Sequence, residues 1–224
     1  MSYQIAIDGP AGAGKSTIAK LVSKELGFVY VDTGAMYRAM ALNCLNNGVD
    51  KEDEKSVVEL CEKTDVSIRY IDGEQAVFLN GVNVNGLIRT PEVGNVASSI
   101  SVYGKVREKL VSLQQSLAVS ENVVMDGRDI GSVVLPNADL KIYLDADVNV
   151  RAKRRFDELT AKGETPSFDT ILEEMKERDY RDTHRDNSPL VRVPDAVYVD
   201  SSYMTIEEVK DAISEEFRKL GKQA

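Results

Sequence analysis

Few side chains in this sequence could build a metal scaffold or a disulfide framework. The chain has two cysteines, Cys44 and Cys61, and a single histidine, His184. A structural zinc site or a disulfide-stabilised fold needs more such residues. We therefore expect both cysteines to be reduced and partly buried in helices, and the compartment to be the cytoplasm. His184 stands in a charged segment, where we expect it to be solvated rather than catalytic.

Long apolar runs and an excess of basic charge are also missing. No apolar run reaches the roughly 18 residues that suggest a membrane span. The first residues pass into a strand-like run without the basic segment of a secretion signal. The net charge of −9 argues against broad nucleic-acid binding, which needs a basic face. We expect small-molecule partners, no nucleic acid, no membrane and, since no coiled-coil pattern occurs, a monomer.

Alternating strand-like and helix-like segments predict an α/β fold with a parallel sheet. The 224 residues suffice for one sizeable core. The expected strands are 3–7, 28–32, 123–126, 140–144 and 196–199. The expected helices are 15–26, 35–47, 149–162, 168–183 and one at the C-terminus. Thr205 and Glu208 form a capping box at the start of that last helix, with a staple between Met204 and Val209.

The alternation is interrupted between about residues 66 and 84 by three short β-prone runs. Asp72-Gly73 and Asn80-Gly81 separate these runs, and both dipeptides favour tight hairpin turns. We therefore expect a small antiparallel insert. Thr90-Pro91 then resembles a helix N-cap followed by proline in the first turn, and it opens helices that extend to about residue 119.

A glycine-rich loop that follows the first strand is the strongest chemical signal. It matches the pattern G-x-x-x-x-G-K-[ST] in full, between a strand and a helix. Its glycines let backbone N–H groups converge on phosphate oxygens, and the helix N-terminus adds positive charge. The pattern predicts binding of a nucleoside triphosphate, with ATP-binding candidates Gly9, Pro10, Ala11, Gly12, Ala13, Gly14, Lys15, Ser16 and Thr17.

Two further segments follow strands of the predicted sheet and so reach the same edge as the loop. Thr33 and Arg38 come after the second strand, where Thr33 can cap a helix and Arg38 can bind a phosphate. Asp126, Arg128 and Asp129 follow the third core strand and suit a second phosphate and a polar ligand edge. The alternatives are a plain helix cap at Thr33 and an ordinary turn at Asp126-Gly127.

Arginines gather on two predicted helices near the C-terminus. Their spacing places each group on one helical face, and the groups are Arg151, Arg154 and Arg155, and Arg178, Arg181 and Arg185. Such a pair of helices suggests a lid that closes over a triphosphate and excludes water. Because acidic residues are equally dense there, a salt-bridged helical face is the alternative.

These segments together resemble the bacterial-type cytidylate kinases over nearly the whole chain. The resemblance rests on the phosphate loop and on the segments 32–38, 88–93, 126–131 and 176–185. It implies a three-layer P-loop fold with a parallel sheet core, a small antiparallel β insert and a helical lid. In that scheme residues 1–62 and 91–224 form the core, with the lid at about 151–185, and residues 63–90 form the insert.

The resemblance also implies roles for individual residues. Thr33, Arg38 and Arg128 look like contacts to the acceptor phosphate, and Ser98, Arg107 and Asp129 like the group that recognises cytosine. Arg178 and Asp182 resemble ribose contacts, and Arg185 resembles another substrate-site arginine. Lys15, Arg128, Arg154 and Arg155 are the candidates for stabilising charge during the reaction. Thr33 stands where the family often has serine, and Ser16 where glycine also occurs.

The implied reaction moves the γ-phosphoryl group of ATP to CMP or dCMP with Mg²⁺ as cofactor. Ser16 and Asp126 are the candidate metal ligands. The loop by itself leaves open a kinase for another nucleoside monophosphate or small metabolite, or a nucleotide-binding switch. A GTPase switch would need the Asn-Lys-x-Asp motif that recognises guanine, which this sequence lacks. A switch function would also leave the second group of arginines without a role.

Overall fold

Helices and strands alternate in the computed structural model, which describes residues 2–221. The chain divides into two compact units, one made of Met1–Tyr30 with Ser120–Ala224 and the other of Val31–Val119. No helix within residues 2–221 combines the length and the apolar character needed to cross a membrane.

The main sheet has five strands in the order β2-β6-β1-β7-β8. Its strands are β1 Gln4–Asp8, β2 Val29–Asp32, β6 Val123–Gly127, β7 Leu140–Asp145 and β8 Val197–Asp200. The central strand β1 runs parallel to both of its neighbours, with Asp8 level with Gly127 on one side and with Tyr143 on the other. The carboxyl ends of β1, β6 and β7 therefore meet at one edge, which confirms the predicted parallel sheet.

Apolar side chains of the sheet and of two helices form the core of the first unit. Helix α1 Lys15–Leu26 packs against β6 and against α8 Ile206–Lys219. Phe217 of α8 is fully buried and contacts Tyr3 and Phe28 edge-on. The predicted capping box of Thr205 and Glu208 is confirmed, and Met204 packs against the same core as Val209.

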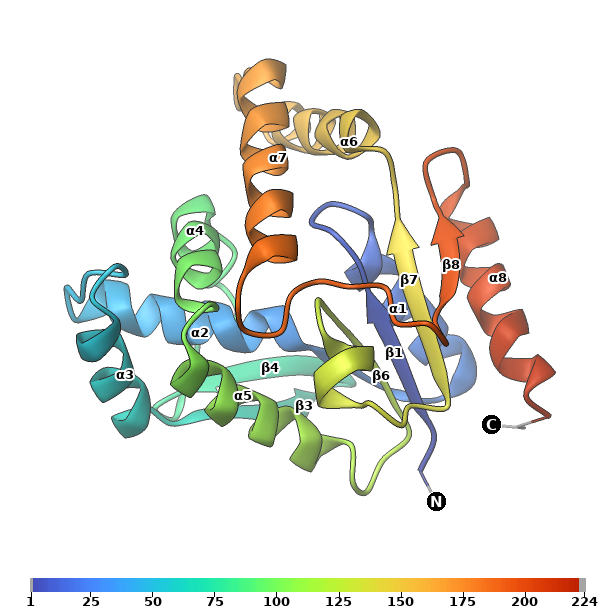
Figure 1. Cartoon of the computed structure of the whole chain (residues 1–224), viewed down its shortest axis with the longest axis horizontal. Coiled ribbons are helices and arrows are strands. Elements are labelled where there is room, and N and C mark those ends of the chain that lie inside the picture. Colours follow the sequence, from blue (N-terminus) through green and yellow to red (C-terminus); the bar gives the residue numbers. More distant parts are fainter. Residues whose placement is uncertain (1, 222–224) are drawn as a thin grey trace. The chain divides into compact units, whose positions relative to one another are not determined.

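Two helices and a short π-helical turn complete the first unit. Helices α6 Val148–Ala161 and α7 Phe168–His184 pack against each other, and α6 follows directly after β7 (Figure 1). A π-helical turn, η1 Ile130–Val134, follows β6 and contacts β1. The sequence patterns did not predict this turn. His184 ends α7 with an exposed ring that stacks on Tyr180, as expected for a solvated histidine.

The second unit combines four helices with a small sheet. The helices are α2 Thr33–Asn46, α3 Glu54–Lys63, α4 Pro91–Ile100 and α5 Gly104–Leu117, and the strands are β3 Val66–Ile71, β4 Glu74–Leu79 and β5 Val82–Asn83. Both strand pairings are antiparallel. Asp72 and Asn80 adopt φ angles of 52° and 48° ahead of Gly73 and Gly81, so the two predicted hairpin turns are confirmed.

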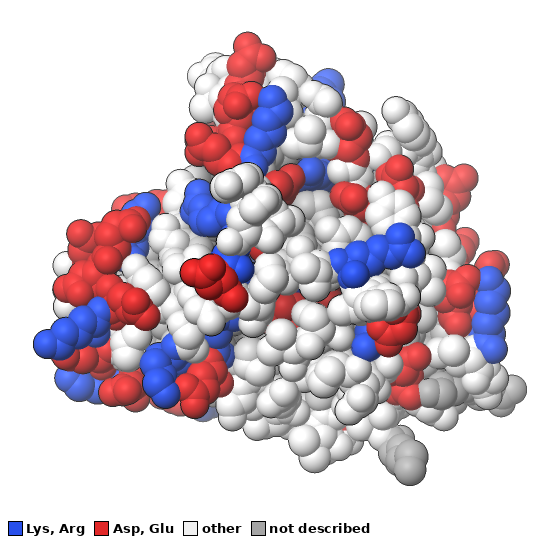
Figure 2. Space-filling view, viewed as in Figure 1, with Lys and Arg blue, Asp and Glu red and all other residues white. Residues whose placement is uncertain are grey.

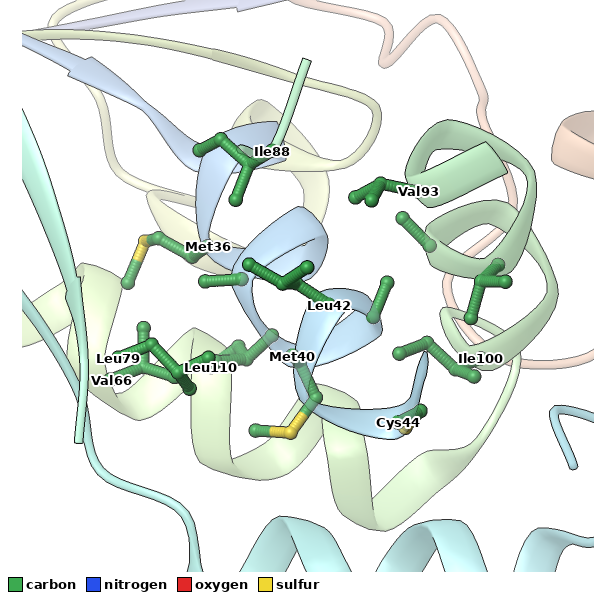
Figure 3. Packing of buried hydrophobic residues seen from close by; sticks show 14 of the residues in the cluster. Met36, Met40, Leu42, Cys44, Val66, Leu79, Ile88, Val93, Ile100 and Leu110 are labelled. Carbon is green, nitrogen blue, oxygen red and sulfur yellow. The ribbon is translucent and has the colours of Figure 1, made fainter. Parts of the chain in front are cut away.

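Helix α2 is the centre of the second core (Figure 3). Met36, Met40 and Cys44 lie along it without exposed surface, and Ile100 and Leu110 surround it. Cys44 and Cys61 are free thiols buried in this core, and burial raises the pKa of Cys44 to about 11. Both cysteines are free and lie in helices, as expected, but they are buried almost completely rather than partly. Burial also raises the pKa of Cys61, so neither thiol is poised to react as a thiolate at neutral pH.

The starting residue of α2 differs from the predicted one. The sequence favoured Thr33 as a cap of a helix from residue 35, but α2 begins at Thr33 and Asp32 is the cap. The Asp32 carboxylate accepts a hydrogen bond of 3.0 Å from the Ala35 backbone N–H. Aspartate and threonine are both good N-cap residues. Because β2 ends at Asp32 and α2 begins at the next residue, Asp32 takes the cap position. Thr90 caps α4 with Pro91 in the first turn, as predicted.

Candidate functional site

The phosphate loop connects the carboxyl end of β1 to the first turn of α1. Gly9 has φ 150°, and a Cβ there would lie 1.9 Å from the backbone oxygen of Leu144, so this position accepts no side chain. Gly14 caps α1 in the left-handed conformation with φ 89°. The loop therefore brings its backbone close to β7 and delivers Lys15 at the N-terminus of α1, where an anion is favoured.

Lys15 is buried at this helix N-terminus. Its amino group donates a hydrogen bond of 2.6 Å to the Pro10 carbonyl. Burial, and then the nearby positive charges of Arg128 and Arg178, hold the pKa of Lys15 well below its usual value, although Asp126 and Asp182 oppose the shift. Burying the positive charge of Lys15 near two arginines is unfavourable, and an anion that enters the site would offset this cost. The site is therefore suited to phosphate.

Ser16 and Asp126, the two candidate metal ligands, are hydrogen-bonded to each other. The Ser16 hydroxyl donates to one carboxylate oxygen of Asp126 over 2.8 Å, and the Tyr30 hydroxyl donates to the other over 2.8 Å. A hydroxyl and a carboxylate beside a phosphate site form a hard oxygen donor set. Mg²⁺ is commonly held by one or two such groups together with substrate phosphates and water, so these residues fit it.

Arg128 and Asp182 form a largely buried ion pair near the same edge. The Arg128 Nε donates to Asp182 over 2.8 Å. Burial acts to raise the pKa of Asp182, but Arg128, Arg178 and Arg185 together hold that pKa below its usual value. Asp182 therefore stays ionised and balances several arginines. Arg185 is also buried, and its Nε donates to the Ser188 carbonyl over 2.8 Å.

Asp129 is the buried residue between β6 and η1. Its carbonyl oxygen accepts hydrogen bonds from the N–H groups of Val133 and Val134, which close the π-helical turn. The next two N–H groups, of Ile130 and Gly131, donate to the carboxylate of Asp8. Asp129 is thus presented by a short turn that is held at both of its ends.

The predicted lid helices carry arginines with different partners. Arg151 is buried and contacts three segments: its guanidinium donates to the Ala146 carbonyl, to the Ala11 carbonyl in the phosphate loop and to Asp179 on α7, over 2.8, 3.0 and 2.6 Å. Arg154 donates to the Ser201 carbonyl over 2.6 Å, and Arg155 pairs with Glu158 on its own helix. The region therefore contains residues that fit each of the two interpretations: Arg155 belongs to a salt-bridged helical face, and Arg151 contacts the phosphate loop.

The second unit holds four of the predicted substrate residues. Thr33 begins α2 and is buried, whereas Arg38, one turn later, donates to the Ile88 carbonyl over 3.3 Å and lies against Gly94 of α4. Ser98 is buried on α4. Arg107 is buried on α5, 5.7 Å from the centre of the Tyr37 ring.

Three polar contacts hold the residue that precedes Thr33. Asp32 pairs with Arg89, and the Gln75 side-chain amide both accepts from the Asp32 N–H, over 2.8 Å, and donates to the Asp32 carbonyl, over 3.2 Å. Gln75 lies on β4 of the insert. The insert thus fixes the start of the helix that carries Thr33 and Arg38.

Within the first unit, the structure brings together a large part of the predicted site. Hydrogen bonds and electrostatic contacts connect Lys15, Ser16, Asp126, Arg128, Arg178 and Asp182. The sequence patterns missed three residues of the networks in this unit, Asp8, Tyr30 and Ser201, and one residue of the second unit, Gln75. For Asp8 the available signal was a polar residue that ends a buried strand directly before the phosphate loop, whereas Tyr30 lies inside β2. Ser201 and Gln75 carried no such signal.

Comparison with known proteins gives one consistent result. Residues 5–219 match the sequence family described as cytidylate kinase. A protein named cytidylate kinase from Caldicellulosiruptor bescii is 50% identical over 218 residues, which cover 97% of this chain and 96% of that protein. One of the same name from Enterococcus faecalis is 48% identical over 217 residues, with coverage of 97% and 96%.

A solved structure shares the fold at low sequence identity. The crystal structure of an uncharacterized protein from Eubacterium ventriosum aligns with a TM-score of 0.55 and 12% identity, and it covers 97% of this chain and 99% of that one. At this identity the likeness concerns the fold alone.

Proposed function

Because the chain belongs to the cytidylate kinase family, we propose that it transfers the γ-phosphoryl group of ATP to CMP or dCMP, giving ADP and CDP or dCDP. The observation that carries this function is the buried cationic site at the end of the parallel strands. Lys15 lies there at a helix N-terminus beside Arg128 and Arg178, with its pKa held down mainly by burial. Such a site stabilises an anion and excludes water from it.

The chemistry requires positioning and charge stabilisation rather than a strong base. The attacking group is already a phosphate oxygen, so no hydroxyl has to lose a proton. We assign the charge-stabilising roles to Lys15, Arg128, Arg154 and Arg155. The Arg154 and Arg155 side chains have neutral or surface partners, Ser201 and Glu158, from which they can move to a phosphate at a modest free-energy cost.

We propose Mg²⁺ as the divalent metal, with the Ser16 hydroxyl and the Asp126 carboxylate as its protein ligands. When bound, the ion would shield the charge of the β- and γ-phosphates. Tyr30 supports this role because its hydroxyl holds the second oxygen of Asp126 and so orients the carboxylate.

The acceptor contacts follow the family resemblance. We propose Thr33, Arg38 and Arg128 for the acceptor phosphate, Ser98, Arg107 and Asp129 for cytosine, Arg178 and Asp182 for the ribose, and Arg185 as a further substrate contact. Burial of Ser98, Arg107, Asp129 and Asp182 supports these roles, because buried polar groups discriminate strongly between ligands that do and do not satisfy them.

We also propose that the protein works as a cytoplasmic monomer with small-molecule substrates. On the face drawn in Figure 2, basic side chains are interspersed with acidic ones, which suits small anions better than a polyanion. Residues 1–62 and 91–224 would act as the core and lid, and residues 63–90 as part of the monophosphate-binding insert.

An ATP-consumption assay over a panel of acceptors tests the function. We expect turnover with CMP and dCMP to exceed that with UMP, AMP and GMP, to stop when EDTA removes divalent metal, and to return with Mg²⁺. Higher turnover with another monophosphate or a small metabolite would assign a different acceptor. Nucleotide binding without acceptor-dependent turnover would contradict the kinase function and favour a switch.

A further inference from the structure

Asp8 is a buried carboxylate with two backbone partners. It is the last residue of β1, directly before the phosphate loop, and 6% of its surface is exposed. One carboxylate oxygen accepts a hydrogen bond of 2.8 Å from the Ile130 N–H, and the other accepts one of 2.7 Å from the Gly131 N–H. The side chain therefore joins β1 to a segment that lies more than a hundred residues later in the chain.

These two N–H groups belong to the residues that follow Asp129. They open the π-helical turn η1, and the carbonyl of Asp129 closes it. Space at this junction is small: a Cβ added to Gly131 would lie 3.4 Å from an Asp8 oxygen and 3.2 Å from the Lys141 side chain. Asp8 thus fixes the position and direction of the backbone from which the Asp129 side chain projects.

The carboxylate occupies this position at a cost in stability. Burial raises the pKa of Asp8 to about 6, and Asp129 adds to the shift, while the two backbone hydrogen bonds and Lys15 partly offset it. At neutral pH an ionised group is therefore buried where a neutral one would be more favourable. The two backbone hydrogen bonds offset part of this cost, and they also fix the geometry of the turn.

We propose that Asp8 is a positioning residue for base recognition, because it aligns the Asp129 turn with the strand that begins the phosphate loop. The inference rests on the proposed function in one respect, since it takes CMP as the acceptor and Asp129 as its base contact. Asp8 itself would touch neither substrate. Its loss should therefore change acceptor binding and acceptor choice more than ATP binding or folding.

The variant Asp8→Asn gives a sharp test because it keeps size and shape. An amide has one acceptor oxygen, so one of the two N–H groups would face an NH₂ donor instead. We expect KM for CMP to rise by about tenfold, in line with the loss of a charge-assisted hydrogen bond. The ratio of kcat/KM for CMP to that for UMP should fall, while KM for ATP stays near the wild-type value.

Thermal unfolding at neutral pH separates positioning from a purely structural role. Asp8→Asn removes a buried charge but leaves one backbone N–H without its acceptor, and since these effects oppose each other we expect a Tm close to that of the wild type even as KM for CMP rises. The control is Asp139→Asn. Asp139 accepts a hydrogen bond of 2.8 Å from the Gln4 N–H at the opposite end of β1, and its replacement should leave both the KM values and the acceptor ratio unchanged.

A second variant approaches the same contact from the other side. Gly131→Ala places a methyl group against Asp8 and Lys141 and should reproduce the rise in KM for CMP if Asp8→Asn does not fold. The inference would be overturned if folded Asp8→Asn had the wild-type KM for CMP and the wild-type ratio of CMP to UMP activity. If only Gly131→Ala folds, the same result in that variant would overturn it. The proposed function is judged separately, on whether the wild-type enzyme phosphorylates CMP at all.

Discussion

Asp129 is the residue on which the choice of acceptor base is expected to depend. Cytosine presents an amino donor where uracil presents a carbonyl acceptor, and a carboxylate pairs with the first and repels the second. Its burial between β6 and η1 makes an unmatched partner costly. The carboxylate is thus suited to reject UMP as well as to bind CMP.

We predict that Asp129→Asn narrows the preference for CMP over UMP. An amide can donate to the uracil carbonyl, so the ratio of kcat/KM values should fall by about tenfold, equivalent to one charge-assisted hydrogen bond. Steady-state kinetics with both acceptors at saturating ATP measure it. Asp211→Asn, which makes the same chemical change at an exposed position on α8, is the control. An unchanged ratio in Asp129→Asn would remove Asp129 from base selection.

The sequence predicted single residues well where local chemistry decides their role. The phosphate loop, the capping box at Thr205 and the two hairpin dipeptides depend on neighbours a few residues away, and the structure confirms each of them as a structural feature. Asp8 escaped prediction as a partner because its hydrogen bonds reach Ile130 and Gly131, which no pattern in the adjacent sequence reveals.

At the scale of elements, the β insert has a contact that gives it a role beyond packing. The Gln75 amide makes a reciprocal pair of hydrogen bonds with the backbone of Asp32, as a neighbouring strand would. Asp32 in turn caps α2 and pairs with Arg89. The start of α2, with Thr33 and Arg38 behind it, is therefore fixed by a strand about forty residues away in sequence.

We predict that Gln75→Ala weakens acceptor binding through α2. Loss of two neutral hydrogen bonds should raise KM for CMP by about three- to tenfold with little change in kcat. Initial-rate measurements over a range of CMP concentrations provide the test. Glu74→Ala, one residue earlier and on the opposite face of the strand, is the control. Equal KM values in the two variants would mean that the insert does not act on the acceptor site.

The elements themselves were predictable to different degrees for physical reasons. Strands of the main sheet are buried apolar runs that end at polar residues, and the predicted and observed bounds agree to within one or two residues. The turn η1 was not predictable, because a π-helical turn is unfavourable on its own and here depends on long-range acceptors. The start of α2 was ambiguous because Asp32 and Thr33 are both good caps.

The molecule as a whole has an acidic net charge, although several of its lysine and arginine side chains are buried. The chain carries a net charge of −9, yet Lys15, Arg107, Arg151 and Arg185 are buried. Buried cations act on an anion that enters their site, whereas the acidic balance repels an extended polyanion. This distribution favours a small phosphorylated substrate, and the sequence indicated it through the contrast between total charge and arginine clustering.

Folding stability as a function of pH provides the last prediction, which concerns Asp8. Its pKa is about 6 in the folded protein and 3.8 as the reference value for an unperturbed aspartate. Because the folded state holds this proton more tightly, the group favours folding below about pH 4, and this contribution is lost as pH rises through 6. The charges that act on Asp8 are those of Asp129, between β6 and η1, and of Lys15 on α1.

We expect the unfolding free energy of the wild type, relative to Asp8→Asn, to fall by about 2 kcal/mol between pH 4 and pH 7. A pKa difference of about two is worth about 1.4 kcal/mol per unit, and part of this effect is already present at pH 4. Chemical denaturation of both proteins across this range measures the difference, and the titrating groups that do not interact with Asp8 cancel in the comparison. No substrate is present, so titration of the CMP phosphate near pH 6 does not interfere. Parallel stability curves would show that Asp8 ionises in the folded protein as it does in the unfolded chain.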